Sequence, residues 1–312
     1  MYRAFVFLSS LLFSLSSFSQ YTETINSNRP GASQGAFAVG NGVMQLETGF
    51  RFDREEHDLE RTETTVYGLD YQARYGFFME KLELTLEGSF RSVNTDFVQG
   101  ASTETLSYSN FQSNTIAGKY LIYDPYFKRE QEEKSYISWK ANNTFQWRDL
   151  IPAISAYAGI NFAFGDNPFL FQGEPNFSPR LGLITQHNYG RWVFVTNFYG
   201  DKLGTDFPSY TGIFTLTHSV GNRFAVFGEF QTIIGDLYSD EIVRGGLAYL
   251  LTKNLQLDLL GLVNFKNTPQ RLGFSLGISY RYDKFRKEER IYDESEKEQL
   301  KSDDNFKLGD KK

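Results

Sequence analysis

The sequence predicts an all-β protein: a closed antiparallel transmembrane β-barrel of about twelve strands, preceded by an N-terminal segment in the periplasm or the lumen. Three observations predict this class. Apolar and polar residues alternate with a period of two along most of the chain, which is typical of strands with two different faces. Short and long connections alternate between these runs. In addition, 17% of the residues are aromatic, which suits strands that end at a membrane interface.

The first twenty residues, MYRAFVFLSSLLFSLSSFSQ, carry Arg3 and then an apolar, serine-rich run. This composition predicts an export signal peptide at 1–19. The polar, glycine-rich stretch 20–42 has no periodicity and is expected to be irregular. The barrel is expected at 43–285, and the charged residues 286–312 are expected to form a disordered periplasmic tail because they hold few apolar side chains.

The last alternating run, LGFSLGISYRYDKF, shows the pattern most clearly. One parity holds Leu, Phe, Leu, Ile, Tyr and Tyr, and the other holds Gly, Ser, Gly, Ser, Arg and Asp. The apolar parity predicts a face toward lipid that ends in interfacial tyrosines, and the small polar parity predicts a face toward the lumen. The predicted strands are 43–53, 64–75, 82–91, 114–123, 154–164, 180–188, 192–198, 209–219, 223–232, 241–251, 255–264 and 272–285.

Connections after the second, sixth, eighth and tenth predicted strands are tight, as in periplasmic turns. The polar stretches 54–63 and 92–108 are expected to be longer external loops. The connection 124–151 breaks this rule, because its position predicts a short turn and it is long. A small hairpin and a surface helix both remain compatible with it.

A soluble β-sandwich also alternates, but its strands are usually about 5–6 residues long. Many runs here reach about ten residues, the length of a tilted strand that crosses a bilayer. A bacterial outer-membrane barrel is therefore favoured over a secreted soluble β protein. The charged side chains of the polar parity are the candidate lumen charges: Glu47, Arg51, Asp70, Arg74, Glu83, Glu87, Arg91, Arg223, Glu229, Arg244, Asp258 and Arg281.

The composition indicates which classes of partner and site the chain lacks. The net charge of -6 and the lack of a basic stripe argue against nucleic acid, and the absence of cysteine excludes disulfides and thiolate metal sites. No cofactor is expected. The expected partners are outer-membrane lipid and lipopolysaccharide, a small-molecule solute, and the barrel-assembly machinery through the C-terminal strand.

The stretch NRPGASQGAFAVGNGVMQLETGF at 28–50 resembles the start of the outer-membrane transporter family labelled "MetA-pathway of phenol degradation". Members of that family open with Asp or Asn before Arg-Pro-Gly, followed by a first strand that reads QxExGF. The stretches 182–201 and 277–283 also fit. The resemblance implies an outer-membrane barrel that passes small hydrophobic or aromatic molecules.

The motif Arg29-Pro30-Gly31 also has a direct physical interpretation. Pro30 and Gly31 favour a tight bend, and Arg29 is able to pair with a lumen carboxylate such as Glu47 or Glu83. The segment would then plug or constrict the periplasmic mouth. A surface turn with a solvated arginine is an equally open alternative.

A search for chemistry finds three histidines, His57, His187 and His218. His57 falls in a charged outer stretch, and the other two fall on the lipid parity near periplasmic turns, where a hydrolase acting on the outer leaflet would not need them. The loop 165–178 offers oxygen groups for calcium, although a turn-rich loop explains them as well. Its exposed aromatics are candidates for contact with a hydrophobic ligand, a plug or lipopolysaccharide: Phe169, Phe171 and Phe177.

The expected function is therefore passive passage of small hydrophobic or aromatic molecules, without enzymatic chemistry. The alternative is a closed structural or adhesive barrel without transport. A lipid-modifying hydrolase is a third, disfavoured hypothesis.

Overall fold

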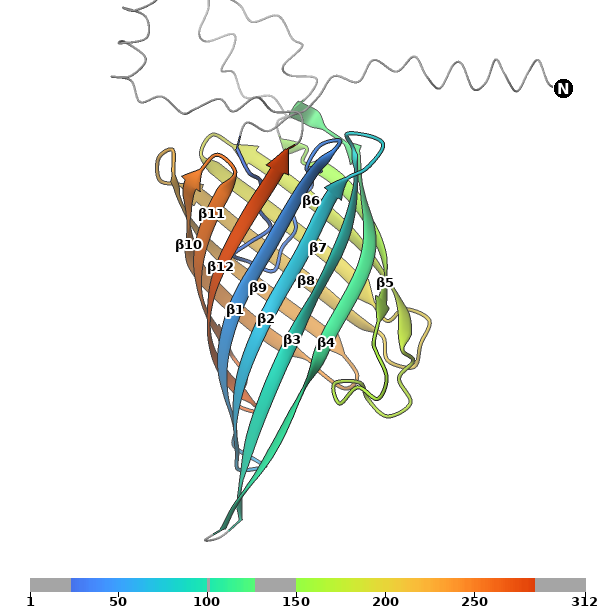
Figure 1. The fold of residues 1–312 in the computed structure, drawn as a ribbon, viewed down its shortest axis with the longest axis vertical. Coiled ribbons are helices and arrows are strands. Elements are labelled where there is room, and N and C mark those ends of the chain that lie inside the picture. Colours follow the sequence, from blue (N-terminus) through green and yellow to red (C-terminus); the bar gives the residue numbers. More distant parts are fainter. Residues whose placement is uncertain (1–23, 100–101, 127–149, 284–312) are drawn as a thin grey trace, which may run out of the picture. The chain divides into compact units, whose positions relative to one another are not determined.

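The computed structural model describes residues 24–99, 102–126 and 150–283, which form a closed antiparallel barrel (Figure 1). The predicted signal peptide, the predicted charged tail and most of the connection 124–151 lie outside the described residues. Within the described part of the chain, no helix is long and apolar enough to cross a membrane.

The described residues contain the expected twelve strands, and each strand pairs with its neighbours in sequence, while β1 pairs with β12 to close the ring. This confirms the predicted fold class. The strands are β1 Val43–His57, β2 Thr62–Gly76, β3 Leu82–Gln99, β4 Ser102–Tyr123, β5 Ala153–Phe162, β6 Phe177–Tyr189, β7 Trp192–Asp201, β8 Ser209–Ser219, β9 Phe224–Gly235, β10 Asp240–Thr252, β11 Leu255–Asn264 and β12 Gln270–Asp283.

The two faces of the strands differ as the alternation predicts. On β12, Leu272, Phe274 and Leu276 are exposed on the outside, whereas Ser275 and Arg281 are buried on the inside. The same exposed apolar parity recurs around the ring. An outer surface of this kind suits lipid, and within the apolar belt the closed ring leaves no open strand edge.

The prediction of long external loops at 54–63 and 92–108 is wrong. These residues extend the strands: β1 pairs with β2 as far as His57 and Thr62, and β3 pairs with β4 as far as Gln99 and Ser102. The β3–β4 hairpin projects beyond the other strands (Figure 1). Polar composition suggested loops, but cross-strand side-chain pairs hold the strands together outside the apolar belt, among them Thr64 with Thr95 at 3.0 Å.

The strand boundaries differ from the sequence prediction elsewhere by a few residues. β9 begins at Phe224, so that Arg223 lies in the preceding tight turn and is exposed. β5 ends at Phe162 and β12 ends at Asp283. Boundaries of this kind depend on turn geometry, which alternation alone does not encode.

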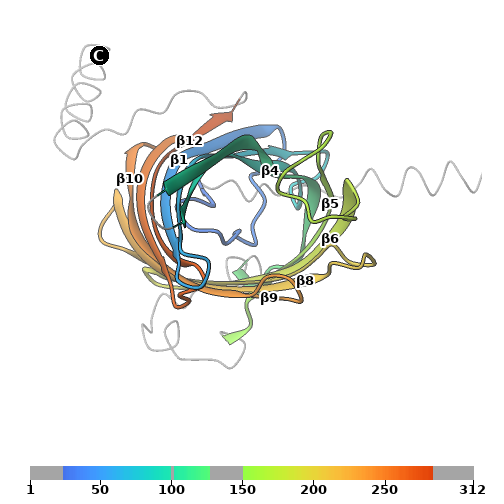
Figure 2. The same cartoon turned by 90° about the horizontal axis from the view of Figure 1, so that it is seen from below.

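Residues 24–42, here called the lumen segment, enter the barrel at the end that carries the tight turns. Seen along the barrel, the segment lies within the ring of strands (Figure 2). Its ends are tied to turns at this end: Ile25 N donates to Lys253 O at 2.8 Å, and Gly42 N donates to Gly76 O at 2.9 Å. Gly40 and Gly42 adopt positive φ values of 92° and 75°, which only glycine takes without strain, where the chain turns into β1.

The outward face yields a first prediction. Leu276 lies in the middle of β12 and is 61% exposed on the outer surface. Leu276→Arg should lower the free energy of unfolding in lipid vesicles by about 2–4 kcal/mol, because a charged side chain at mid-membrane is poorly solvated. Urea titration of the refolded barrel measures this change.

The matched control is Leu59→Arg. Leu59 lies between β1 and β2, beyond the apolar belt, and is 81% exposed. It should leave the unfolding curve unchanged. Equal effects of the two substitutions would contradict the assignment of the outer face to lipid.

Candidate functional site: a barrel lumen filled by its own N-terminal segment

The lumen segment has no strand ladder to satisfy its backbone, so the barrel wall supplies the partners. Carboxylates accept its N–H groups: Glu47 Oε2 accepts from Arg29 N at 3.1 Å, Glu229 Oε1 from Ala32 N at 3.0 Å, and Glu83 Oε2 from Val39 N at 3.0 Å. The three acids stand on β1, β9 and β3, far apart in the sequence.

Cationic and hydroxyl side chains of the wall donate hydrogen bonds to the backbone carbonyls of the lumen segment. Lys119 Nζ donates to Gly35 O at 2.8 Å, Arg74 Nη1 donates to Asn26 O at 2.7 Å, and Ser155 Oγ donates to Ala36 O at 2.6 Å. The wall residues that bond the segment come from strands all around the barrel: Glu47, Arg74, Glu83, Lys119, Ser155, Gln186, Asn197, Glu229, Asp258, Ser275 and Arg281.

The Arg29-Pro30-Gly31 motif lies inside the barrel. The Arg29 guanidinium bonds Asp258 at 3.0 and 3.2 Å and Ser275 at 3.0 Å, while Glu47 takes only its backbone N–H. The partners suggested by sequence, Glu47 and Glu83, are thus not the partners of its side chain. Sequence reasoning missed Asp258 as its partner because 229 residues separate the two.

Glycines in the wall make room for this motif. A Cβ on Gly49 or Gly277 would collide with the Arg29 guanidinium, and a Cβ on Gly31 would collide with the Glu229 carboxylate. Gly277 belongs to the small polar parity of the last strand. The small residues of that face are therefore required where the lumen segment packs against the wall.

The most deeply buried charges form one group under the segment. Arg74 contacts Glu83 at 2.8 Å and Glu47 at 3.2 Å, and Lys119 contacts Glu83 at 3.2 Å. All four side chains have no exposed surface. Two cations and two carboxylates balance, and such a group is tolerated in a dry interior because every charge has partners.

The other candidate lumen charges are also paired, apart from one. Arg51 contacts Asp53 at 2.6 Å, Arg91 bonds Asp70, Arg180 contacts Glu87 at 3.3 Å, and Arg244 contacts Glu229 at 2.9 Å. Arg281 donates to the carbonyl of Thr24 at 3.0 Å and to Asn254. Arg223 belongs instead to the turn at the mouth.

Sequence reasoning missed Lys119 and Arg180. Lys119 shares the inward parity of β4 with Ala117 and Leu121, so its strand lacked a clean polar face. Arg180 lies at the predicted start of the sixth strand and packs against Tyr199, with its guanidinium 4.5 Å from the ring centroid. Tyr157 on the neighbouring β5 also faces the lumen, and the Arg180 guanidinium lies 5.7 Å from the centroid of its ring. An aromatic residue on the polar parity of a strand was the available signal, because an inward aromatic ring favours a cation as its partner.

Two cavities flank the lumen segment. The vestibule, of about 590 Å³, reaches toward the end with the longer loops and is lined by Arg51, Asp70, Glu87, Arg180 and other polar side chains. The mouth cavity, of about 280 Å³, lies among the tight turns. Residues 28–31 and Ser33 line both cavities, so the segment stands between them.

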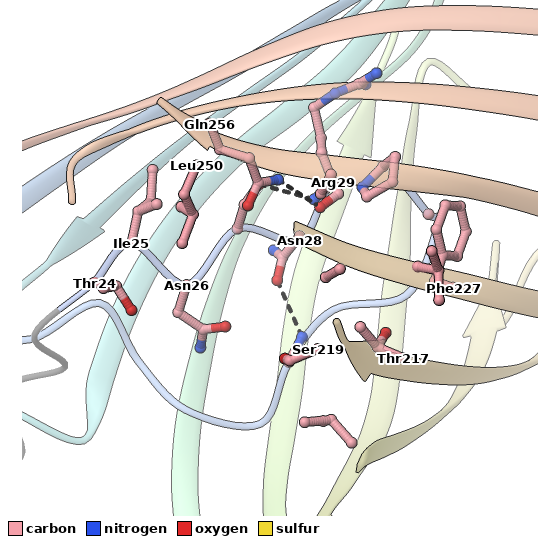
Figure 3. A pocket seen from close by; sticks show the side chains of 18 of the residues that line it. Thr24, Ile25, Asn26, Asn28, Arg29, Thr217, Ser219, Phe227, Leu250 and Gln256 are labelled. Carbon is pink, nitrogen blue, oxygen red and sulfur yellow. Dashed lines mark hydrogen bonds between the residues drawn. The ribbon is translucent and has the colours of Figure 1, made fainter. Parts of the chain in front are cut away.

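Figure 3 shows the mouth cavity from close by: Asn28 and Arg29 lie among the residues that line it, and the Arg29 side chain points away from Gln256. Gln256 Nε2 donates to the Arg29 carbonyl at 3.1 Å, and Asn28 Oδ1 accepts from Gly35 N at 3.0 Å (Figure 3). The second bond closes the segment on itself. The segment therefore enters the lumen as a compact loop with its own internal support.

The candidate external aromatics do not gather at one place. Phe169 lines the vestibule and packs on Tyr108 with ring centroids 5.4 Å apart. Phe171 stacks on Phe207 at 6.2 Å, and Phe177 is exposed at the start of β6. Two oxygen groups of the same loop have protein partners: Glu174 contacts Lys202 at 2.6 Å, and Asn167 Oδ1 accepts from Phe169 N at 3.0 Å. Among the described residues, no group of three histidine or acidic side chains is placed to hold a metal.

A family model described as "Putative MetA-pathway of phenol degradation" matches residues 27–282. This confirms the resemblance drawn from the residues around Arg29. No curated protein matches the chain.

Among solved structures, an outer membrane channel from Pseudomonas putida F1 is similar at 12% identity and a TM-score of 0.52, over 82% of this chain and 100% of that chain. The KdgM porin in complex with disordered oligogalacturonate scores 0.43 at 11% identity, over 76% and 99% of the two chains. A mutant of the TodX monoaromatic hydrocarbon channel scores 0.41 at 9% identity, over 83% and 96%. The first of these likenesses supports the barrel fold.

The buried charges yield a second prediction. Arg74→Met should lower the free energy of unfolding by about 3–5 kcal/mol, because Glu47 and Glu83 would keep their charges in a dry site with Lys119 alone to balance them. Urea titration in lipid vesicles measures the loss.

Arg54→Met is the control, since Arg54 pairs with Glu63 where both side chains are more than half exposed. Its cost should stay below about 1 kcal/mol. A loss at Arg74 as small as the loss at Arg54 would show that the group is hydrated rather than buried.

Proposed function

Because the chain belongs to the "MetA-pathway of phenol degradation" family and folds as a barrel with an apolar outer surface, we propose that it is an outer-membrane channel gated by its own lumen segment. Small molecules pass it by diffusion. The observation that carries this proposal is the position of residues 28–33 between two cavities that reach opposite ends of the barrel.

The bonding of the lumen segment suits a gate. Its contacts with the wall are separate hydrogen bonds to its backbone, such as those with Glu47, Glu229 and Lys119, together with side-chain contacts such as the Arg29–Asp258 ion pair, rather than a strand ladder. Bonds of this kind, which involve a charged partner, contribute about 1.5–3 kcal/mol each, and water replaces them when they break. The segment is able to shift without opening any strand pair, so the barrel stays closed to lipid while its lumen opens.

The family label supports small aromatic molecules as solutes. The vestibule wall adds a constraint, because it is polar and its charges are paired within the protein. A solute that crosses it without a large desolvation cost is small and carries no net charge of its own. Uncharged aromatic molecules with a polar group meet both conditions.

The histidines support a channel rather than a hydrolase. His218 stacks on Trp192 with ring centroids 4.1 Å apart, while the adjacent Ser219 lines the mouth cavity from the other face of β8. His57 ends β1, where its Nδ1 accepts from Glu60 N at 3.2 Å. The contacts of His218 and His57 are thus with an aromatic ring and a backbone N–H, not with a serine hydroxyl that a general base would activate.

Two partners of the barrel follow from its surface. We propose that β12 carries the signal for the barrel-assembly machinery, since its exposed parity runs without interruption to Tyr280 and Tyr282. We propose that the external ends of the strands contact lipopolysaccharide. Loss of assembly in cells after Tyr282→Ala, with unchanged refolding in detergent, would support the first of these.

A disulfide lock provides the third prediction, because the chain contains no cysteine. Ser27 Oγ lies 2.7 Å from Ser279 Oγ on β12, and Ser33 Oγ lies 2.8 Å from Thr215 Oγ1 on β8. Ser27→Cys with Ser279→Cys, and Ser33→Cys with Thr215→Cys, should each form a bond that fixes the segment to the wall. Oxidation should reduce benzyl alcohol and glycerol entry into liposomes to the level of protein-free liposomes, and reduction should restore it.

The matched control joins two wall residues. Ser89 and Ser113 face each other on β3 and β4 with their hydroxyl oxygens 3.1 Å apart, so Ser89→Cys with Ser113→Cys leaves the segment free. Its liposomes should remain permeable in both redox states. Equal entry through the locked and reduced forms would contradict gating by the segment. If no solute enters through any form, the channel proposal fails and a closed structural or adhesive barrel is the better account.

A further inference from the structure

A third hollow, lined mainly by apolar side chains, lies at the external end of the barrel, outside the lumen. This outer aromatic pocket, of about 190 Å³, is formed by three loops, which join β5 to β6, β7 to β8, and β9 to β10. Its lining includes Phe171, Phe207, Pro208, Leu237 and Tyr238. Neither the family match nor the lumen segment accounts for it.

The pocket is held in shape by contacts between its loops. Glu174, with a side chain only 2% exposed, contacts Lys202 Nζ at 2.6 Å and accepts from Phe171 N at 3.2 Å. Thr205 Oγ1 donates to Lys202 O at 2.7 Å and accepts from Phe207 N at 3.1 Å. These bonds fix the two phenylalanines in a stack with their rings 13° from parallel.

The third loop closes the other side. Ser239 Oγ donates to Gly235 O at 2.9 Å, and Lys266 Nζ donates to Ser239 O at 2.8 Å. Tyr238 OH donates to Asp240 Oδ2 at 2.6 Å. Burial raises the pKa of the Tyr238 hydroxyl above its ordinary value, and Asp236, which also lines this wall, is exposed to solvent.

We propose that the outer aromatic pocket binds an uncharged single-ring aromatic molecule and delivers it to the vestibule. This inference rests on the proposed channel function. An apolar cavity of about 150 Å³ is sufficient for benzene, so the pocket has the size for one substituted ring. Lys202, Ser209 and Ile233 line both the pocket and the vestibule, so the two hollows adjoin.

The charges of the pocket select against ions. Lys202 is already neutralised by Glu174 and lies over the Phe171 ring, 5.4 Å from its centroid. A carboxylate ligand would have to displace Glu174 from a largely buried pair, and an ammonium ligand would meet Lys202, with only the solvent-exposed Asp236 of the lining to attract it. An uncharged ring stacks on Phe171 or Phe207 without disturbing this pair, and the Ser209 hydroxyl lies at the passage to the vestibule as a partner for a polar substituent.

Calorimetric titration of the full-length protein in detergent tests this site, with benzyl alcohol as the probe and benzoate as the charged comparison. Benzyl alcohol should bind one saturable site, and benzoate should bind at least tenfold more weakly. Phe207→Ala should weaken benzyl alcohol binding about fivefold or more, because it removes one stacking face. Phe171→Ala should have a similar effect, and it serves if the first variant does not refold.

Phe265→Ala is the matched control, because Phe265 lies between β11 and β12 outside the pocket and is 70% exposed. It should bind benzyl alcohol as the unaltered protein does. Absence of saturable binding, or equal affinity in the pocket variants and the control, would overturn the proposal. Glycerol entry into liposomes, measured on the same preparations, separates the two proposals. Glycerol entry without benzyl alcohol binding would contradict the binding pocket but not the channel. Benzyl alcohol binding without any glycerol entry would contradict the channel but not the binding site.

Discussion

The Arg74 guanidinium is the interaction on which the rest of the lumen depends. It binds Glu83 and Glu47 on the two flanking strands and also the Asn26 carbonyl of the lumen segment, and it has no exposed surface. A charge in such a place requires partners on every side. β1, β2, β3 and the segment therefore meet at this one side chain, which couples the placement of the segment to the neutralisation of charges in the wall.

This coupling explains why so polar a chain forms a stable membrane protein. Lipid demands an apolar outer face and a closed set of backbone bonds, and the strands meet both demands. The inner face is left with charges that need neutralising, and the irregular N-terminal segment needs partners for its backbone. The wall charges and the backbone of the segment satisfy each other. Glu47, Glu229 and Lys119 form hydrogen bonds with the segment, and the segment shields them from solvent.

The alternation of apolar and polar residues was sufficient to predict the fold, because lipid and lumen impose opposite demands on successive side chains. It failed at 54–63 and 92–108, where polar residues occupy both parities of the β1–β2 and β3–β4 hairpins and the contrast between the two faces disappears. It could not predict contacts across the lumen. Arg29 pairs with Asp258 because the barrel closes, and local sequence carries no trace of that pairing. The outer aromatic pocket was hidden for the same reason, since Phe171 and Phe207 meet only when two loops are placed by their strands.

The central claim is that the N-terminal segment is seated inside the folded barrel, and cysteine labelling in intact outer membranes tests it most directly. Ala36 has no exposed surface, and its N–H and carbonyl are bonded to Gln186 and Ser155 of the wall. A single Ala36→Cys should resist a water-soluble maleimide in the folded protein and react after unfolding, whereas Leu59→Cys at the exposed end of the first hairpin should react at once. Equally rapid labelling at both positions in the folded protein would place the segment outside the lumen and contradict this account.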